Sequence, residues 1–202
     1  MAIIKEIVQQ THNRFLNMFE LKVRRKNGSE GSYFVASRAE KPEGIECARH
    51  TVKPDGVIIY AGTSDREKVL LVRQYRYPID TYVYELPAGL VDPGEDYRTA
   101  AVREVHEETG LHFTPIDVDP MYEKPRYMTV GMTDECCACV YGYIDGELST
   151  DYMEATEEIV PLLVDREEAV RILREERVAA PCAYHIERFA VEEEPFAYME
   201  KK

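Results

Sequence analysis

The chain has 202 residues, of which 45% are hydrophobic and 31% charged, and its formal net charge is −13. These values predict a globular protein with room for one full domain and a small appended one. The negative charge argues against nucleic-acid binding, because a nucleic-acid-binding face needs clustered Lys and Arg. No apolar run has the length of a membrane span, and the N-terminus lacks a signal-peptide pattern. We therefore expect a cytoplasmic protein without a membrane partner.

The cysteines point to the same compartment. There are five of them, and three crowd into residues 136–139. The odd count and the lack of a targeting segment predict reduced thiols. A zinc site is disfavoured, because no second pair of ligands stands at metal-site spacing. We interpret residues 135–143 as a buried strand instead.

The N-terminal region has the pattern of a β-hairpin. Residues 3–10 are mixed and predict no definite element. Apolar and polar residues partly alternate over 15–25, which predicts a strand, and residues 33–37 predict a second one. Asn27-Gly28 between them is a hairpin turn signal. A two-stranded hairpin is marginal alone, so we expect it to pack on the main domain or on another subunit.

A turn-like segment at 41–44 separates this hairpin from the rest of the chain. We place the boundary within residues 40–52 and divide the chain into an N-terminal β unit, 1–48, and a main domain, 49–202. In the main domain, helices are predicted to begin at Asp165 as an N-cap and to span 166–177 and 179–189, followed by a charged tail that frays. Apolar, β-rich runs predict strands at 57–60, 69–73, 82–86, 121–126, 135–144 and 159–164. This order indicates an α+β fold with a mixed sheet.

The most informative stretch is a loop that runs into a helix. Residues 92–94, Asp-Pro-Gly, are a strong turn signal. Residues 97–109 are good helix formers, and Gly110 is expected to end the helix. Glu104 and Glu108 are four residues apart, so their carboxylates share one face and repel each other. A hard divalent cation such as Mg²⁺ would compensate, since it binds one or two carboxylates together with water and phosphates. The alternative is an ordinary solvated acidic helix.

The full spacing of residues 89–111 is far more specific than this acidic pair. It fits Gly-x5-Glu-x7-Arg-Glu-apolar-x-Glu-Glu-x-Gly-apolar, which is the Nudix box. The seven fixed letters are Gly89, Glu95, Arg103, Glu104, Glu107, Glu108 and Gly110. At residue frequencies of about 5–7%, seven such letters coincide by chance roughly once in 10⁹ starts. The chain therefore resembles a Nudix hydrolase.

This resemblance implies an α/β/α sandwich and Mg²⁺-dependent cleavage, with Mn²⁺ as a substitute, of a nucleoside diphosphate linked to another group. Metals are needed because the charged diphosphate repels hydroxide until its oxygens are neutralised. Arg103 is implied to position the carboxylates by charge-assisted hydrogen bonds, and Glu95 to brace the loop. Glu107 acts either as a direct ligand or through water. The implied metal ligands are the carbonyl oxygen of Ala88 and the carboxylates of Glu104, Glu107 and Glu108.

A general base is implied outside this helix, on an acidic loop before the last strand. Here that loop is residues 151–158. Glu157 is our first candidate and Glu154 the second. The alternative for each of them is a solvated acidic loop.

The surrounding sequence resembles ADP-ribose or nucleotide-sugar pyrophosphatases, in the segments 73–76 (Arg-Gln-Tyr-Arg), 85–89 (Glu-Leu-Pro-Ala-Gly) and 131–135 (Gly-Met-Thr-Asp-Glu). Arginine forks match phosphate oxygens, although a surface strand with cation–π contacts would also explain them. The candidate substrate contacts are Arg73, Tyr75, Arg76, Glu85 and Gly131.

One departure bears on the substrate. Val130 stands immediately before Gly131, where the ADP-ribose subgroup usually has Pro. Hydrolysis of ADP-ribose to AMP and ribose 5-phosphate is the leading hypothesis, and UDP-sugars or GDP-sugars are the alternative. The segments quoted above argue against a nucleoside triphosphate or dinucleoside polyphosphate. A non-catalytic nucleotide sensor would have lost box carboxylates that this chain retains. Related enzymes use an N-terminal β unit to dimerise and to cover the base, so a homodimer is implied.

Overall fold

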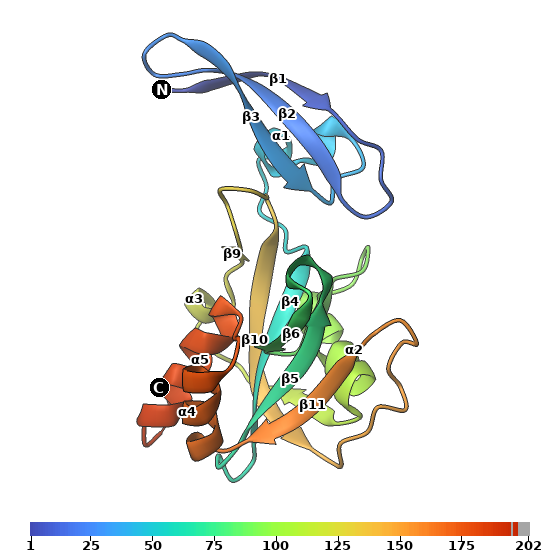
Figure 1. Cartoon of the computed structure of the whole chain (residues 1–202), viewed down its shortest axis with the longest axis vertical. Helices are drawn as coiled ribbons and strands as arrows, with labels where there is room; N and C mark the ends of the chain where they lie inside the picture. Colours follow the sequence, from blue (N-terminus) through green and yellow to red (C-terminus); the bar gives the residue numbers. More distant parts are fainter. Residues whose placement is uncertain (195, 198–202) are drawn as a thin grey trace. The chain divides into compact units, whose positions relative to one another are not determined.

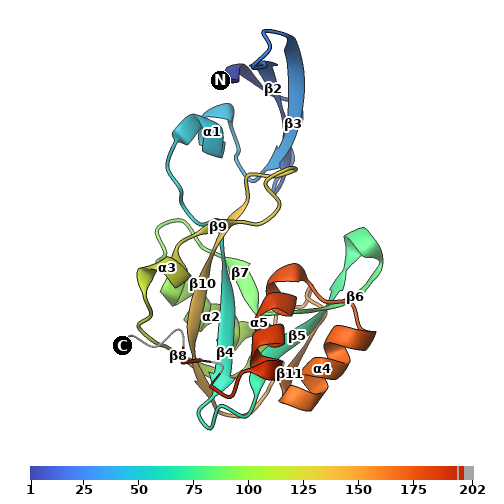
Figure 2. The same cartoon turned by 90° about the vertical axis from the view of Figure 1, so that its left-hand side faces the viewer.

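The computed structural model describes residues 1–194, 196 and 197. It contains two compact units, one formed by Met1–Asp55 with Pro125–Cys137 and the other by Gly56–Lys124 with Ala138–Lys202 (Figures 1 and 2). Residues 125–137 pack within the first unit, although the division predicted from sequence counted them with the main domain. No helix in the described part of the chain is both long enough and apolar enough to cross a membrane.

The first unit is built on a three-stranded antiparallel sheet in the order β1-β2-β3, where sequence predicted only a hairpin. Its strands are β1 (Ile3–Gln9), β2 (Asn17–Arg24) and β3 (Glu30–Ser37). Strand β1 was not predicted, because its register against β2 shifts between Ile4 and Glu6. Such an irregularity breaks the two-residue alternation by which a strand is recognised.

The core of this unit is small and lies on one face of the sheet. It consists of Phe19, Leu21, Val35 and Ile45. The last of these lies between a short 3-10 helix, η1 (Pro42–Gly44), and α1 (Glu46–Arg49).

The segment 125–137 is held against β3 and α1 by directed hydrogen bonds. The amide of Ala36 donates to the carbonyl of Met132 at 2.9 Å. The carboxylate of Asp134 accepts from the hydroxyl of Ser37 at 3.1 Å and from the amide of Glu46 at 2.9 Å. These bonds explain why the segment belongs to the first unit, a grouping that local sequence patterns cannot indicate.

The second unit is organised around a large mixed sheet in the order β11-β5-β4-β10-β8, with β6 beside β5 and β7 beside β4. In Figure 1, β4 and β10 run in the same direction, whereas the register-paired neighbours such as β5 and β11 are antiparallel. The bounds of the strands in this sheet are β4 (Gly56–Thr63), β5 (Val69–Arg76), β6 (Thr81–Glu85), β7 (Ala88–Leu90), β8 (His112–Pro115), β10 (Cys136–Asp145) and β11 (Ile159–Val164). The first two residues of β10 are counted with the first unit.

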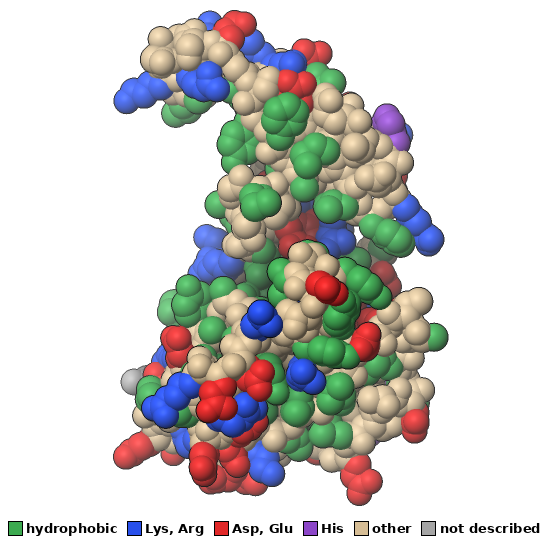
Figure 3. Space-filling model, viewed as in Figure 1, with side chains coloured by type: hydrophobic (Ala, Val, Ile, Leu, Met, Phe, Trp, Pro, Cys, Tyr) green, Lys and Arg blue, Asp and Glu red, His purple; other side chains and the backbone are tan. Residues whose placement is uncertain are grey.

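Helices cover both faces of this sheet. One face is covered by α2 (Tyr97–Thr109), and the other by α4 (Arg166–Glu175) and α5 (Ala180–Val191). The predicted α/β/α sandwich with a mixed sheet and a small N-terminal β unit is therefore confirmed. The solvent side of α4 and α5 carries interspersed positive and negative side chains, as Figure 3 shows.

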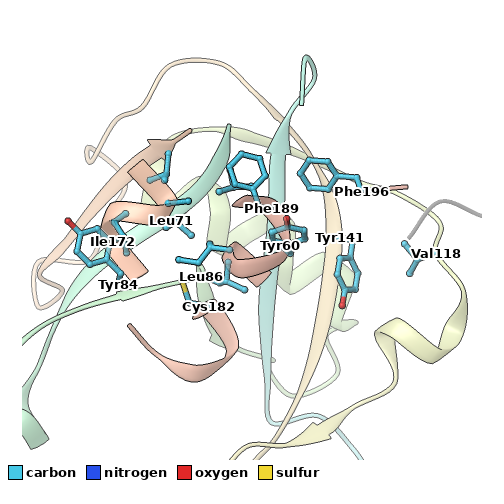
Figure 4. Close-up of a cluster of buried hydrophobic side chains, with 14 residues drawn as sticks. Tyr60, Leu71, Tyr84, Leu86, Val118, Tyr141, Ile172, Cys182, Phe189 and Phe196 are labelled. Carbon is cyan, nitrogen blue, oxygen red and sulfur yellow. The ribbon is translucent and has the colours of Figure 1, made fainter. Parts of the chain in front are cut away.

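Each face of the sheet has its own core. Under α2, Ala101 and Val105 are fully buried against strand residues such as Leu70. On the other face, Tyr60 packs among residues of α4 and α5 (Figure 4). Phe196 joins this cluster, with its ring 5.2 Å from that of Tyr60. The expectation of a frayed tail is wrong at Phe196, because burial of its ring anchors the chain there; residues 195 and 198–202 lie outside the described part.

The strand predicted over residues 121–126 is also wrong. The chain instead forms a short helix, α3 (Pro120–Glu123), and a two-residue strand, β9 (Arg126–Tyr127). Asp119 caps the helix by accepting from the amide of Met121 at 2.9 Å, and a proline suits the first helical position. Local capping therefore outweighs the apolar composition of the segment.

Candidate active site

The site is built on α2, whose ends are set by its own sequence. The carboxylate of Asp96 accepts from the amides of Arg98 at 3.0 Å and Thr99 at 3.3 Å, which makes it the N-cap. Gly110 ends the helix with a left-handed φ of 74°. The helix thus spans the predicted residues 97–109.

Glu104 extends from α2 toward β7 and lies directly against Gly89. A Cβ placed on Gly89 would stand 1.9 Å from the carboxyl carbon of Glu104. Any other residue at position 89 would therefore displace this carboxylate. The close approach explains why the chemistry of the box requires glycine there.

Arg103 is the hub of a hydrogen-bonded network. Its guanidinium group donates to both carboxylate oxygens of Glu95, at 3.1 and 3.0 Å, and to the carbonyl of Leu90 at 3.0 Å. It also donates to Glu104 at 2.8 Å and to Glu107 at 3.0 Å. The hydrogen bonds from Arg103 lower the pKa of Glu95. The Arg103 side chain therefore fixes the loop before α2 and orients two carboxylates on this helix.

Glu108 is the most unusual carboxylate of the described chain. Its side chain is only 3% exposed, and its Oε2 atom is buried without a hydrogen-bond partner. Burial raises the pKa of Glu108 well above its ordinary value, and the charges of Glu104 and Glu157 act in the same direction. A hydrogen bond with the backbone of Ala88 and the charge of Arg76 oppose this shift.

These features fit a hard cation. A buried carboxylate oxygen without a partner is costly unless something binds it. Burial also raises the pKa of Glu104, again disfavouring the charged form. Within the described residues no three acidic, His or Cys side chains are already clustered for a metal. Carboxylates from one or two residues, completed by water and substrate phosphates, are the usual Mg²⁺ ligands in proteins.

The candidate bases differ in their surroundings. Glu157 is half-buried, and burial is the main cause that raises its pKa. Its charge contributes to the raised pKa of both Glu104 and Glu108, which places it within electrostatic reach of the carboxylate face. Glu154 is exposed, and its carbonyl accepts from the amide of Glu157 at 3.0 Å in a tight turn.

Arg76 is engaged with Glu85 across the β5–β6 hairpin. The guanidinium group donates to both carboxylate oxygens, at 2.7 and 2.5 Å, in a bidentate pair. Because the charge of Arg76 lowers the pKa of Glu108, this pair lies near the carboxylate face. Sequence named both residues as candidates but missed their pairing, which depends on strand register.

The other substrate candidates lie in different surroundings. Arg73 stacks over the ring of Tyr82 at 4.3 Å, the cation–π arrangement that was weighed as the alternative to phosphate binding. The hydroxyl of Tyr75 bonds to Asp80, and its ring packs edge-on against that of Tyr82 at 5.5 Å.

Gly131 belongs to the first unit rather than to the second. Its carbonyl accepts a hydrogen bond from the hydroxyl of Tyr33 at 2.5 Å. It is exposed, and a Cβ placed on it would have nothing within 4 Å. Its role in substrate binding stays a prediction.

Comparison with known proteins gives the family of the chain. The NUDIX domain model matches residues 52–185. A nudix hydrolase of Caenorhabditis elegans is 36% identical over 119 residues, which cover 55% of this chain and 52% of that protein. The chain therefore spans only about half the length of this relative.

Two further proteins are similar over most of the chain. An ADP-ribose pyrophosphatase of Bacillus subtilis is 28% identical over 160 residues, which cover 76% of this chain and 82% of that protein. A crystal structure of an ADP compounds hydrolase superposes with a TM-score of 0.64 at 18% identity, covering 86% of this chain and 83% of that one. At this identity the structural likeness supports the fold.

The chain belongs to the Nudix family, as the box predicted. Its relatives also confirm the predicted resemblance to ADP-ribose pyrophosphatases.

Proposed function

We propose that this protein hydrolyses the diphosphate bond of a nucleoside diphosphate sugar with the help of Mg²⁺, and that ADP-ribose is cleaved to AMP and ribose 5-phosphate. The observation that carries this proposal is the buried oxygen of Glu108 without a partner, beside Glu104 on the box helix. The pyrophosphatases among the relatives support the substrate class.

The carboxylates of Glu104 and Glu108 would hold the cation, together with the carbonyl of Ala88 and with Glu107 directly or through water. When bound, the cation supplies charge neutralisation at the diphosphate oxygens and orients a water. Arg103 holds Glu104 and Glu107 in place by hydrogen bonds at 2.8 and 3.0 Å. The protein thereby arranges its ligands before substrate arrives, which lowers the reorganisation needed in the reaction.

Glu157 is our preferred general base, and it would accept the proton of the attacking water. A base works best when its pKa lies near the working pH, and burial raises the pKa of Glu157 in that direction. Glu154 is exposed, so no such burial supports it. We therefore expect replacement of Glu157 by Gln to reduce kcat more than the same change at Glu154.

Arg76 would offset the acidity of the chain at the substrate. Its pairing with Glu85 holds the guanidinium group near the carboxylate face. A fork held in this way can meet a phosphate oxygen while one carboxylate fixes its plane. Arg73 and Tyr75 extend the same strand, and we propose them as more distant contacts.

The first unit is proposed to mediate a homodimer and to cover the nucleobase. It exposes several large apolar side chains, which a partner subunit would bury. Apolar residues scattered singly over a surface need no such explanation, but a group of them indicates an interaction site. They are Ile3, Ile4, Phe15, Leu16, Met18, Tyr33 and Phe34. Sedimentation analysis of wild type and of Phe34→Glu tests this assignment. We expect a dimeric wild type and a monomeric Phe34→Glu, and a monomer in both samples would contradict the proposal.

The substrate proposal is tested by a hydrolysis panel with Mg²⁺ that compares ADP-ribose, UDP-glucose, GDP-mannose and a nucleoside triphosphate. We expect the highest kcat/KM for ADP-ribose, with AMP and ribose 5-phosphate as products. Preference for a UDP-sugar or GDP-sugar would show that Val130 marks a different specificity. A panel without turnover would refute catalysis and favour a nucleotide sensor.

A further inference from the structure

The loop that carries Glu157 is fixed at both of its ends. At its start, the amide of Ser149 donates to the carbonyl of Thr109 at 2.8 Å. The fit there is tight, because a Cβ on Gly110 would stand 2.8 Å from the Cβ of Ser149. At its end, the carbonyl of Glu158 accepts from the amide of Tyr75 at 3.1 Å. The residues between these points, 150–157, include both candidate bases.

An aromatic contact ties the middle of this loop to α2. The ring of Tyr152 lies 4.2 Å from the ring of His106, with 36° between the planes. His106 in turn stacks on His112 at 6.1 Å and 10°. Tyr152 remains 56% exposed, so it contributes little to the core and its contact with α2 stands out.

His106 occupies the variable position of the box, between Glu104 and Glu108. A side chain at this position turns away from the face that its neighbours two residues on either side share. It can therefore serve a second purpose without disturbing the carboxylates. Here it offers a flat surface against which the loop can pack.

We infer that Tyr152, packed on His106, is a positioning residue that holds the loop so that Glu157 faces the carboxylates of α2. The role assigned to Glu157 rests on the proposed function, whereas the ring contact does not. Support comes from the charge of Glu157, which is felt by both Glu104 and Glu108. Without the ring contact, residues 150–157 would lose a restraint between their two fixed ends and would gain conformational freedom.

The kinetic consequence follows from geometry. Displacing a catalytic group by about 1 Å can reduce a rate by about 10²-fold. A loop that visits its proper position only part of the time loses less, so we expect Tyr152→Ala to reduce kcat by about tenfold. KM should stay within about twofold, because the proposed phosphate contacts lie on β5 and β6.

The kinetic test compares wild type with four variants of the ring contact and one control variant. Tyr152→Ala and His106→Ala should both lower kcat, and His106→Ala by at least as much, because it also removes the stacking on His112. The double variant should be no worse than His106→Ala, because both single changes remove the same Tyr152–His106 contact. Tyr152→Phe keeps the ring and should restore kcat. The control is Tyr184→Ala, since Tyr184 is a 68% exposed tyrosine on α5, on the other face of the sheet. Wild-type kcat in Tyr152→Ala, or fully multiplicative losses in the double variant, would overturn the inference.

A second measurement is independent of turnover. The chain contains no Trp, so Tyr152→Trp introduces a unique fluorophore. Its steady-state anisotropy should fall when His106→Ala is added, because the indole loses the surface that restrains it. The same addition to Tyr184→Trp should change nothing. An unchanged anisotropy at position 152 would overturn the positioning role. A wild-type protein without hydrolase activity but with this fall would refute the proposed function and leave the loop contact standing.

Discussion

The close approach of Gly89 to Glu104 makes a sharp test of the site. In Gly89→Ala the new methyl group would stand 1.9 Å from the carboxyl carbon, where ordinary contact begins at 3.4 Å. The carboxylate must therefore move away by about 1.5 Å, because atoms cannot overlap that far in a packed interior. Overpacking of this kind costs about 1–3 kcal/mol of unfolding free energy. Displacing a ligand this far should reduce kcat/KM by at least about 10²-fold.

The assay combines urea unfolding with hydrolysis of ADP-ribose at increasing Mg²⁺. Gly89→Ala should be less stable than wild type and should need more Mg²⁺ for half-maximal rate. Gly31→Ala is the control, because the three atoms nearest to a Cβ on Gly31 all belong to the guanidinium group of Arg25, which can swing into solvent. In a Glu104→Ala background the methyl at position 89 has no carboxylate to displace, so its cost in unfolding free energy should largely vanish.

The result that would refute this reasoning is equal kcat/KM and equal Mg²⁺ dependence in Gly89→Ala and wild type. A destabilisation that persists in the Glu104→Ala background would also contradict it, because the collision would then involve other atoms.

Other predictions concern Glu108, the candidate substrate contact Arg76 and the candidate bases. Mg²⁺ at 100 times its Kd should stabilise the fold by about 2.7 kcal/mol, and Glu108→Gln should abolish most of the resulting rise in Tm; an equal rise in both would remove Glu108 from the ligand set. Because the pKa of Glu108 is raised in the fold, its contribution to stability is complete below about pH 4.3 and is lost as the pH rises through the raised value. In the presence of a chelator the unfolding free energy of Glu108→Gln should therefore fall less than that of wild type as the pH rises toward neutral. Parallel curves of unfolding free energy against pH for the two proteins would contradict this. Arg76→Ala should mainly raise KM. Glu85→Gln is the control, because it weakens the Arg76–Glu85 ion pair but keeps the Arg76 side chain. An unchanged KM in Arg76→Ala would leave Arg76 with a structural role only. Glu157→Gln should lower kcat more than Glu154→Gln, and the reverse order would exchange their roles.

Local sequence was sufficient for α2 and its carboxylates. The helix has its cap at Asp96 and its left-handed end at Gly110 within the segment itself, so helical periodicity alone places Glu104 and Glu108 on one face. The apolar strands β4, β5, β6, β10 and β11 could be predicted for the same reason, because each pattern is complete within a few residues. Strands β7 and β8 were not predicted, because they are only three and four residues long.

Contacts between distant segments could not be predicted from the sequence. The Arg76–Glu85 pair depends on the register of a hairpin, and the burial of Phe196 depends on a space left beside Gly62, where a Cβ would stand 2.3 Å from the Phe196 ring. Likewise, Asp134 joins its segment to the first unit through bonds to residues about 90 positions away. No pattern within either partner segment encodes such pairings.

The measurement that tests the central claim most directly is Mg²⁺-dependent release of AMP from ADP-ribose by wild type, Glu104→Gln and Glu108→Gln, with circular dichroism to verify folding. We predict turnover by wild type that a chelator abolishes, and rates lower by orders of magnitude in both folded variants. Near-normal turnover by either folded variant would contradict the assignment of these two carboxylates as the metal-binding centre.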